Sequence, residues 1–225
     1  RTSVFDRFSA GACEAVLGME DAGRLLGDLE RTNLFLVALD ARGEWYRYHH
    51  LFRELLQIEL ASTNPEIVPG LHRAAAEWFH ANGLIEEALA HAAAFSHDEL
   101  AKILAEEHLR LIRAGKIDLL TRYLDLLGDD ELERHPVAAA AGAIVAGAEG
   151  QPTVQRRRME EIAEAQLERL PNADRPYVEF VVALSRASFL DQELESTLGH
   201  ATRCIELARS QVHDLLVIAL AVFAY

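Results

Sequence analysis

One stretch of the sequence changes its hydrophobic period without a break, and this change constrains the fold more than any other feature. Glu44–Tyr48 alternates between polar and apolar side chains, which is typical of a half-buried strand. The residues that follow, 51–56, carry apolar side chains at helical spacing. Two adjacent histidines, His49 and His50, stand at the junction. The pattern predicts a strand that runs directly into a helix, with two imidazoles at the corner.

The residues before this junction predict a small module with two helices and a β-hairpin. Ser9 is a good N-cap for a short helix that ends at Gly18, and Asp21 can cap a second helix through Arg31. Residues 34–39 are rich in β-formers, and residues 40–43, Asp-Ala-Arg-Gly, have the chemistry of a turn. Residues 1–65 are therefore expected to form a winged-helix-like module.

The rest of the chain, residues 66–225, reads as paired helices. Asn64-Pro65 and Pro69-Gly70 punctuate its start. Turn signals then recur at Gly83, Gly115, Gly150 and residues 191–192, with spacings of 32, 35 and about 41 residues. These spacings lie near the tetratricopeptide period of about 34 residues. The expected fold class is mainly α: a winged-helix-like module with a β-hairpin, followed by a TPR-like α–α superhelix of antiparallel helix pairs.

The apolar pattern sets the expected bounds of these helices and their packing. The helices are predicted over residues 71–82, 84–92, 100–114, 117–127, 137–149, 154–170, 177–190 and 193–209. Small residues at 75, 88 and 92 would let the first two helices approach closely, while Trp78 and Phe79 fill the space between pairs. Helix 117–127 carries leucines on two faces, which predicts burial on both sides, as in a repeat array.

The formal charge of −14 argues against binding to nucleic acids. Acidic residues outnumber basic ones in both parts of the chain, and such a surface repels phosphate backbones. Helix 21–31, at the place of a recognition helix, lacks a basic face. The run Arg156-Arg157-Arg158 is followed by Glu160, Glu161 and Glu164 on the same helix. This arrangement predicts a solvated helix face on which arginines and glutamates of the same helix form ion pairs, rather than a phosphate-binding patch.

Further expectations concern compartment and context. Cys13 and Cys204 lack a C-x-x-C partner, and no apolar run reaches the length of a membrane span, about 18–20 residues. A cytoplasmic protein that does not bind membranes is therefore expected. The chain starts at Arg1 and stops inside an apolar run, 212–225, which predicts that it is a piece of a longer polypeptide. An apolar helix at that end also predicts self-association.

The histidine pair leaves three interpretations open. A metal site at His49 and His50 is weakly supported because adjacent side chains diverge and no carboxylate or cysteine stands at ligand spacing. A catalytic dyad lacks a recognisable nucleophile. One ring can also simply pack at the strand–helix corner. The other histidines, at 72, 80, 91, 97, 108, 135, 200 and 213, show no ligand spacing. No catalytic residue and no metal ligand are therefore assigned.

A family resemblance narrows this choice. Residues 35–40 (Phe-Leu-Val-Ala-Leu-Asp), followed by Trp45–Leu56, resemble the winged-helix end of the ATPase core in MalT-like, large LuxR-type transcriptional regulators. These regulators are signal-transducing (STAND) ATPases. Tyr48-His49-His50-Leu51 is similar to the Met-His-x motif of related nucleotide switches. The resemblance implies that His49, with His50 as second choice, contacts the phosphate of bound ADP and holds the resting state.

The same resemblance implies partners outside the sequence. The phosphate-loop motif Gly-x-x-x-x-Gly-Lys-[Ser/Thr] does not occur in it, so no cofactor is expected for this segment alone, and the segment is not expected to be an enzyme. ATP or ADP would bind an ATPase domain upstream, and DNA a helix-turn-helix domain downstream, while a small-molecule or protein effector of unknown identity binds the helical region. Two other functions remain: a TPR-type protein–protein interaction scaffold without a transcriptional role, and an enzyme that uses His49 and His50.

Overall fold

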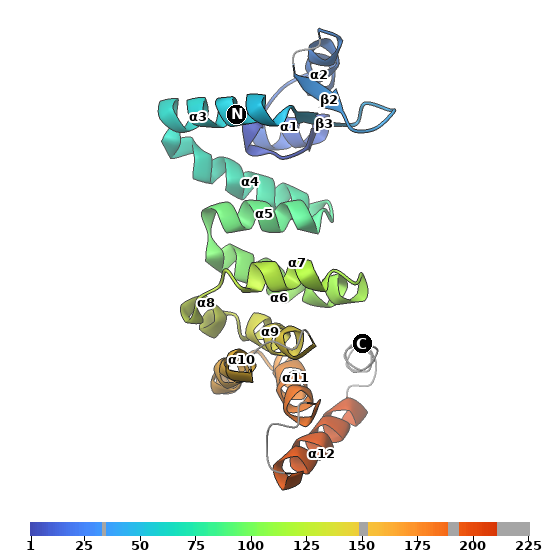
Figure 1. The fold of residues 1–225 in the computed structure, drawn as a ribbon, viewed down its shortest axis with the longest axis vertical. Helices are drawn as coiled ribbons and strands as arrows, with labels where there is room; N and C mark the ends of the chain where they lie inside the picture. The colour runs from blue at the N-terminus through green and yellow to red at the C-terminus, as the bar shows by residue number, and fades with distance from the viewer. Residues whose placement is uncertain (33–34, 149–152, 189–193, 211–225) are drawn as a thin grey trace. The chain divides into compact units, whose positions relative to one another are not determined.

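The computed structural model describes residues 1–32, 35–148, 153–188 and 194–210, and the chain divides into two compact units, Arg1–Ser96 and His97–Tyr225 (Figure 1). The predicted fold class is confirmed: the chain is mainly α, with a small antiparallel sheet in the first unit. The elements of the first unit are η1 (Thr2–Val4), β1 (Phe8–Ser9), α1 (Ala10–Leu17), α2 (Ala22–Arg31), β2 (Leu36–Ala38), β3 (Trp45–Tyr48), α3 (His50–Thr63), η2 (Pro65–Ile67), α4 (Val68–Ala81) and α5 (Ile85–Phe95).

Local rules explain the first helix. The Ser9 hydroxyl accepts a hydrogen bond from the Ala12 amide at 3.2 Å, and Gly18 ends α1 in the left-handed conformation, as predicted. Helix α2 begins after Asp21 as predicted, but the expected capping bond is absent. Asp21 itself adopts a positive φ of 56°, and its side chain does not cap the helix.

The hairpin is the predicted one, but the sheet has a third strand. Asp40 organises the turn because its carboxylate accepts hydrogen bonds from the amides of Arg42, Glu44 and Trp45. Strand β3 then pairs with β2 on one side and with β1 on the other, in the order β1-β3-β2. Strand β1 was not predicted from the sequence, because two residues are too few to show alternation.

Helices α4 and α5 pack against the winged-helix elements in the same compact unit, beyond the boundary predicted after residue 65. The expectation that Pro69-Gly70 interrupts the chain is wrong, because α4 begins at Val68 and contains both residues. Proline fits there, since the first amides of a helix have no partner within it. Ala75, Ala88 and Ala92 are buried between the helices as predicted.

The described elements of the second unit are α6 (His97–Arg113), α7 (Ile117–Leu124), α8 (Asp129–Arg134), α9 (Pro136–Ala148), α10 (Thr153–Ala165), η3 (Leu167–Arg169), α11 (Arg175–Ser188) and α12 (Leu194–Ser210). The predicted pairs α6–α7, α9–α10 and α11–α12 are in contact, as is α4–α5 in the first unit. Gly115 makes the predicted turn with a φ of 68°. The turns predicted at Gly150 and at 191–192, and helix 212–225, lie outside the described residues.

Several predicted helix bounds in this unit are wrong. Helix α7 ends at Leu124, and a short helix that the sequence analysis missed, α8, follows it. Helix α10 ends at Ala165 rather than at residue 170. The double burial predicted for residues 117–127 holds for Leu119 and Leu120, but Leu126 is 46% exposed because it lies beyond the end of α7.

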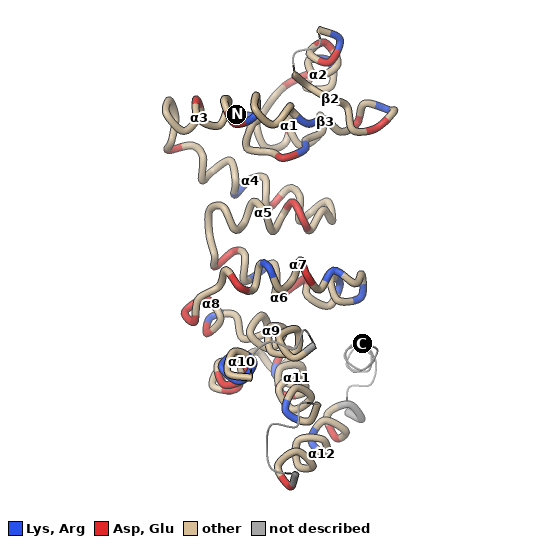
Figure 2. Tube along the Cα trace, viewed as in Figure 1, with Lys and Arg blue, Asp and Glu red and all other residues tan. Residues whose placement is uncertain are grey.

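Helix α9 forms the centre of the second unit. It contacts α6, α7, α10 and α11, and it carries no charged residue in its described span, whereas the neighbouring α10 carries both signs (Figure 2). A helix that is apolar on all sides fits such a central place. Gly142 allows the close approach of α10, because a Cβ atom there would lie 2.5 Å from the Met159 sulfur.

Candidate functional site

The candidate site lies where β3 passes into α3. His49 is the N-cap residue of α3 and has an extended backbone, with φ −56° and ψ 135°, so the helix starts at His50. Its amide donates to the Phe35 carbonyl at 2.8 Å, and its carbonyl accepts from the amides of Phe52 and Arg53, each at 3.0 Å. The backbone of His49 is therefore held on both sides by the strand and the helix.

Both imidazoles face solvent rather than the core. His49 and His50 are exposed, and their ring centroids lie 4.4 Å apart with an angle of 32° between the ring planes. The interpretation that one ring packs into the corner is therefore wrong. The corner is filled instead by Phe52, whose ring lies 5.1 Å from Phe35 and 5.5 Å from Tyr48. The histidines are free to contact a ligand.

A pocket of about 340 Å³ opens beside the two histidines. Its wall is formed by Asp6, Val37, Arg47, Tyr48, His49, His50 and Arg53. These residues include two guanidinium groups and two imidazoles against a single carboxylate. The pocket thus has a positive balance although the chain as a whole carries a charge of −14. A small cavity of this charge is suited to an anion.

The start of α3 adds to this preference. Helix α3 has 14 residues, and its N-cap makes no side-chain hydrogen bond to the first turn. The first amides of a helix carry partial positive charge. Because the amide of Phe52 already donates to the His49 carbonyl, the amides of His50 and Leu51 are the ones that an anion can contact here. The uncapped helix terminus, the imidazoles and the guanidinium groups therefore favour the same kind of ligand at the same place.

Tyr48 and Arg53 fix the pocket to the N-terminal segment. The Tyr48 hydroxyl lies 2.7 Å from the Thr2 hydroxyl, and burial raises the pKa of Tyr48. Arg53 donates through Nε to the Ser3 carbonyl at 3.2 Å and through Nη1 to Asp6 at 2.7 Å. Two residues of the pocket wall, Tyr48 and Arg53, are thus hydrogen-bonded to residues 2–6.

The geometry around His49 and His50 supports neither a metal site nor a catalytic dyad. Among the residues that the structure describes, no group of three or more histidine, cysteine, aspartate or glutamate side chains is placed to hold a metal ion. The pocket wall holds neither a serine nor a cysteine that an imidazole could activate. What the pocket offers is binding of an anion by hydrogen-bond donors.

The structure also brings together two histidines that the sequence analysis treated as isolated. His72 of α4 and His91 of α5 lie 2.9 Å apart between their Nδ1 atoms. His91 is buried, stacked on Phe79 and in edge contact with Phe5. Burial, followed by the nearby His72 and Arg53, lowers the pKa of His91 to about 3. The two histidines are 19 residues apart in sequence, and they come together because α4 and α5 pack as a helical hairpin.

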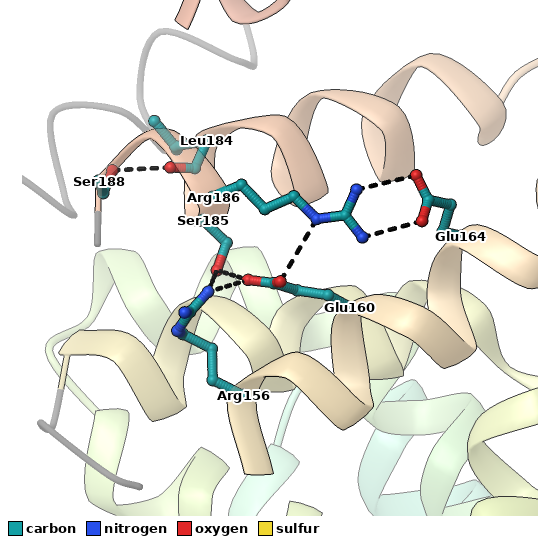
Figure 3. A network of polar contacts seen from close by, with 7 residues as sticks. All are labelled: Arg156, Glu160, Glu164, Leu184, Ser185, Arg186 and Ser188. Atoms are coloured by element: carbon teal, nitrogen blue, oxygen red, sulfur yellow. Dashed lines mark hydrogen bonds and ion pairs between the residues drawn. The ribbon is translucent and has the colours of Figure 1, made fainter. Parts of the chain in front are cut away.

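The arginine run on α10 also differs from the prediction. Arg156 and Glu160 do pair along the helix, but they are 2% and 1% exposed, so the expected solvated face is wrong at these two positions. Ser185 donates to Glu160 at 2.5 Å, and Arg186 bridges Glu160 and Glu164 (Figure 3). Helix α11 covers this side of α10, which a pattern within one helix cannot show.

A hollow of about 200 Å³ lies near this network, among α10, α11 and α12. Glu164 and Arg186 form one side of it, and Glu179 and Arg203 form another. Each arginine is already paired with the glutamate named with it, at 2.8 Å and 2.7 Å. These ion pairs join the three helices, and the charges in this hollow balance one another.

A three-stranded antiparallel sheet with a hairpin wing and supporting helices defines a winged-helix domain. Residues 1–68 match the family described as MalT winged helix domain. The HTH-type transcriptional regulator MalT of Vibrio cholerae serotype O1 is 30% identical over 135 residues, which is 60% of this chain and 15% of that protein. MalT of Klebsiella pneumoniae is 37% identical over 126 residues, or 54% of this chain and 14% of that protein.

These matches confirm the resemblance to MalT-like regulators that residues 35–56 predict, and residues 1–68 are similar to the MalT winged helix domain. The chain spans about 15% of the length of the curated relatives that it matches. Within the described residues, no helix is both long enough and apolar enough to cross a membrane.

Proposed function

We propose that this chain is the switch segment of a cytoplasmic, MalT-like transcriptional regulator, and that the pocket beside His49 binds the phosphate of a nucleotide. The observation that carries the proposal is the positive pocket at the uncapped start of α3, lined by His49, His50, Arg47 and Arg53. Imidazole and guanidinium groups donate hydrogen bonds to phosphate oxygens, and such charge-assisted bonds are strong.

In this proposal the nucleotide is held mainly by an ATPase core in the intact regulator, and the winged helix adds a contact to its phosphate. His49 is the first choice for this contact because its backbone is fixed by three hydrogen bonds. ADP held in this way keeps the winged helix against the core in the resting state. Effector binding in the helical region, through α6–α12, would loosen this contact and permit self-association.

The charge pattern supports the assignment of DNA binding to another part of the regulator. The exposed residues of α2 include Arg24 and Asp28, Asp21 lies exposed just before the helix, and Arg31 is paired with Asp28. A helix with this pattern does not offer the row of unpaired cations that phosphate contacts require. A LuxR-type helix-turn-helix domain in the intact regulator is the proposed DNA-binding part.

The proposal is tested on the chain itself with inorganic pyrophosphate, which carries the chemistry of the nucleotide's phosphates. Nuclear magnetic resonance of the histidine rings should show that pyrophosphate shifts the signals of His49 and His50 and leaves that of the buried His91 unchanged. His49→Ala should weaken binding, whereas Glu54→Gln, a change on an exposed residue of α3, should not. Pyrophosphate binding that is equal in the wild type and His49→Ala would refute the role of His49.

A further inference from the structure

Arg53 stands out in the pocket because its position is set by the backbone of another segment. It lies in the first turn of α3, and its Nε atom donates to the Ser3 carbonyl at 3.2 Å. Gln57 donates to the same carbonyl at 3.0 Å, so two side chains of α3 hold this point of the N-terminal segment. The guanidinium plane is thereby oriented before any ligand arrives, which favours binding.

The other contact of the guanidinium group is of a different kind. Arg53 Nη1 donates to Asp6 at 2.7 Å, and Asp6 lines the same pocket. The Asp6 side chain is 85% exposed, whereas that of Arg53 is 28% exposed. An ion pair with so exposed a carboxylate contributes little to stability, because water solvates the carboxylate well when the pair opens. Asp6 therefore binds the Arg53 guanidinium group only weakly.

We propose that Arg53 is a second phosphate-binding side chain of the pocket and that Asp6 is its built-in competitor. The ligand class is a phosphate that carries two or more negative charges, such as the terminal phosphate of a nucleoside diphosphate. This inference rests on the proposed function of the pocket. Phosphate binding at Arg53 displaces the Asp6 carboxylate and frees residue 6 from α3.

This competition predicts selectivity for charge. Asp6 is attached to the same chain, so its effective concentration at Arg53 is in the range of millimolar or above. A monocarboxylate in solution offers the same chemistry and does not displace it at similar concentrations. A phosphate dianion offers more charge and more acceptor atoms to the same donors, and also to His49. Acetate should therefore fail where pyrophosphate binds.

The experiment is a double-mutant cycle on the 225-residue chain, with pyrophosphate binding followed by the ring signals of His49 and His50, which every variant of the cycle retains. Asp6→Asn should tighten pyrophosphate binding about threefold, and Arg53→Gln should weaken it about tenfold. In the Arg53→Gln background, Asp6→Asn should have no effect, because the residue for which Asp6 competes is gone. Glu54→Gln removes an exposed carboxylate from the same helix and serves as the matched control.

The outcomes separate this proposal from its premise. A gain from Asp6→Asn that persists in the Arg53→Gln background would mean that Asp6 acts only through its long-range charge, and the competitor role would be refuted. Binding that depends on His49 but not on Arg53 would refute the inference and leave the proposed function intact. Absence of pyrophosphate binding in both the wild type and Asp6→Asn would overturn both. Circular dichroism of each variant checks that the fold is retained.

Discussion

The buried histidine His91 makes the stability of the first unit depend on pH between 7 and 5. In an unfolded chain the pKa of a histidine is about 6.5, whereas burial lowers the pKa of His91 to about 3 in the folded state. Below pH 6.5 the unfolded state binds a proton that the folded state does not. Protonation therefore favours unfolding, and the free energy of unfolding falls as the pH falls from 6.5 toward 3.

The size of this loss follows from the unfolded-state pKa alone, as long as the pH stays above the folded-state value. At pH 5, which lies 1.5 pH units below the unfolded value, the loss is about 2 kcal/mol, at 1.36 kcal/mol per unit. The side chain is 5% exposed, so solvent screens this effect little. The pKa of His72 is also lowered by burial, which adds to the loss in the same direction.

Tryptophan fluorescence in urea is a suitable assay, because both tryptophans, Trp45 and Trp78, lie in the first unit. The free energy of unfolding should be about 2 kcal/mol lower at pH 5 than at pH 7 in the wild type. His91→Leu, which lacks the titrating group, should lose much less over the same range. His50→Gln changes an exposed histidine and should behave like the wild type. An equal pH dependence in wild type and His91→Leu would refute the reasoning.

Two further predictions concern buried polar groups. Arg156→Met leaves the buried Glu160 carboxylate with fewer partners and should lower the stability of the second unit by about 3 kcal/mol, measured by hydrogen exchange on α10 and α11. Arg156→Met combined with Glu160→Met should restore most of this loss, and a double variant as unstable as the single one would contradict the account. Ser3→Ala should stabilise the first unit by about 1 kcal/mol in urea, since the buried Ser3 hydroxyl has no partner among the described residues. A loss of stability there would show that this hydroxyl has a favourable role.

Short-range chemistry explains what the sequence analysis could predict. The cap at Ser9, the turn at Asp40 and the helix end at Gly115 each depend on a few neighbouring residues, and all three are confirmed. The junction at residues 45–50 is equally local, because a change of hydrophobic period marks it. The resemblance to MalT-like regulators rests on this same stretch, and the family match over residues 1–68 confirms it.

Contacts between distant residues explain what the sequence analysis missed. Strand β1 is a strand only because Phe8 and Ser9 lie opposite Tyr46 and Trp45. The burial of Arg156 depends on α11, and its pattern along α10 alone resembles that of a solvated helix. In the candidate site, the sequence indicated His49 and His50. Their neighbour Arg53 was missed as a site residue because its role depends on Ser3 and Asp6, about 50 residues away.

The central claim is that the imidazole of His49 holds the phosphate of a nucleotide in the intact regulator. The dissociation rate of ADP from that protein tests the claim most directly. Loss of one charge-assisted hydrogen bond costs about 2 kcal/mol, so His49→Ala should release ADP about 30-fold faster and raise the basal transcriptional activity. Glu54→Gln should leave both unchanged. An ADP dissociation rate in His49→Ala equal to that of the wild type would contradict the account.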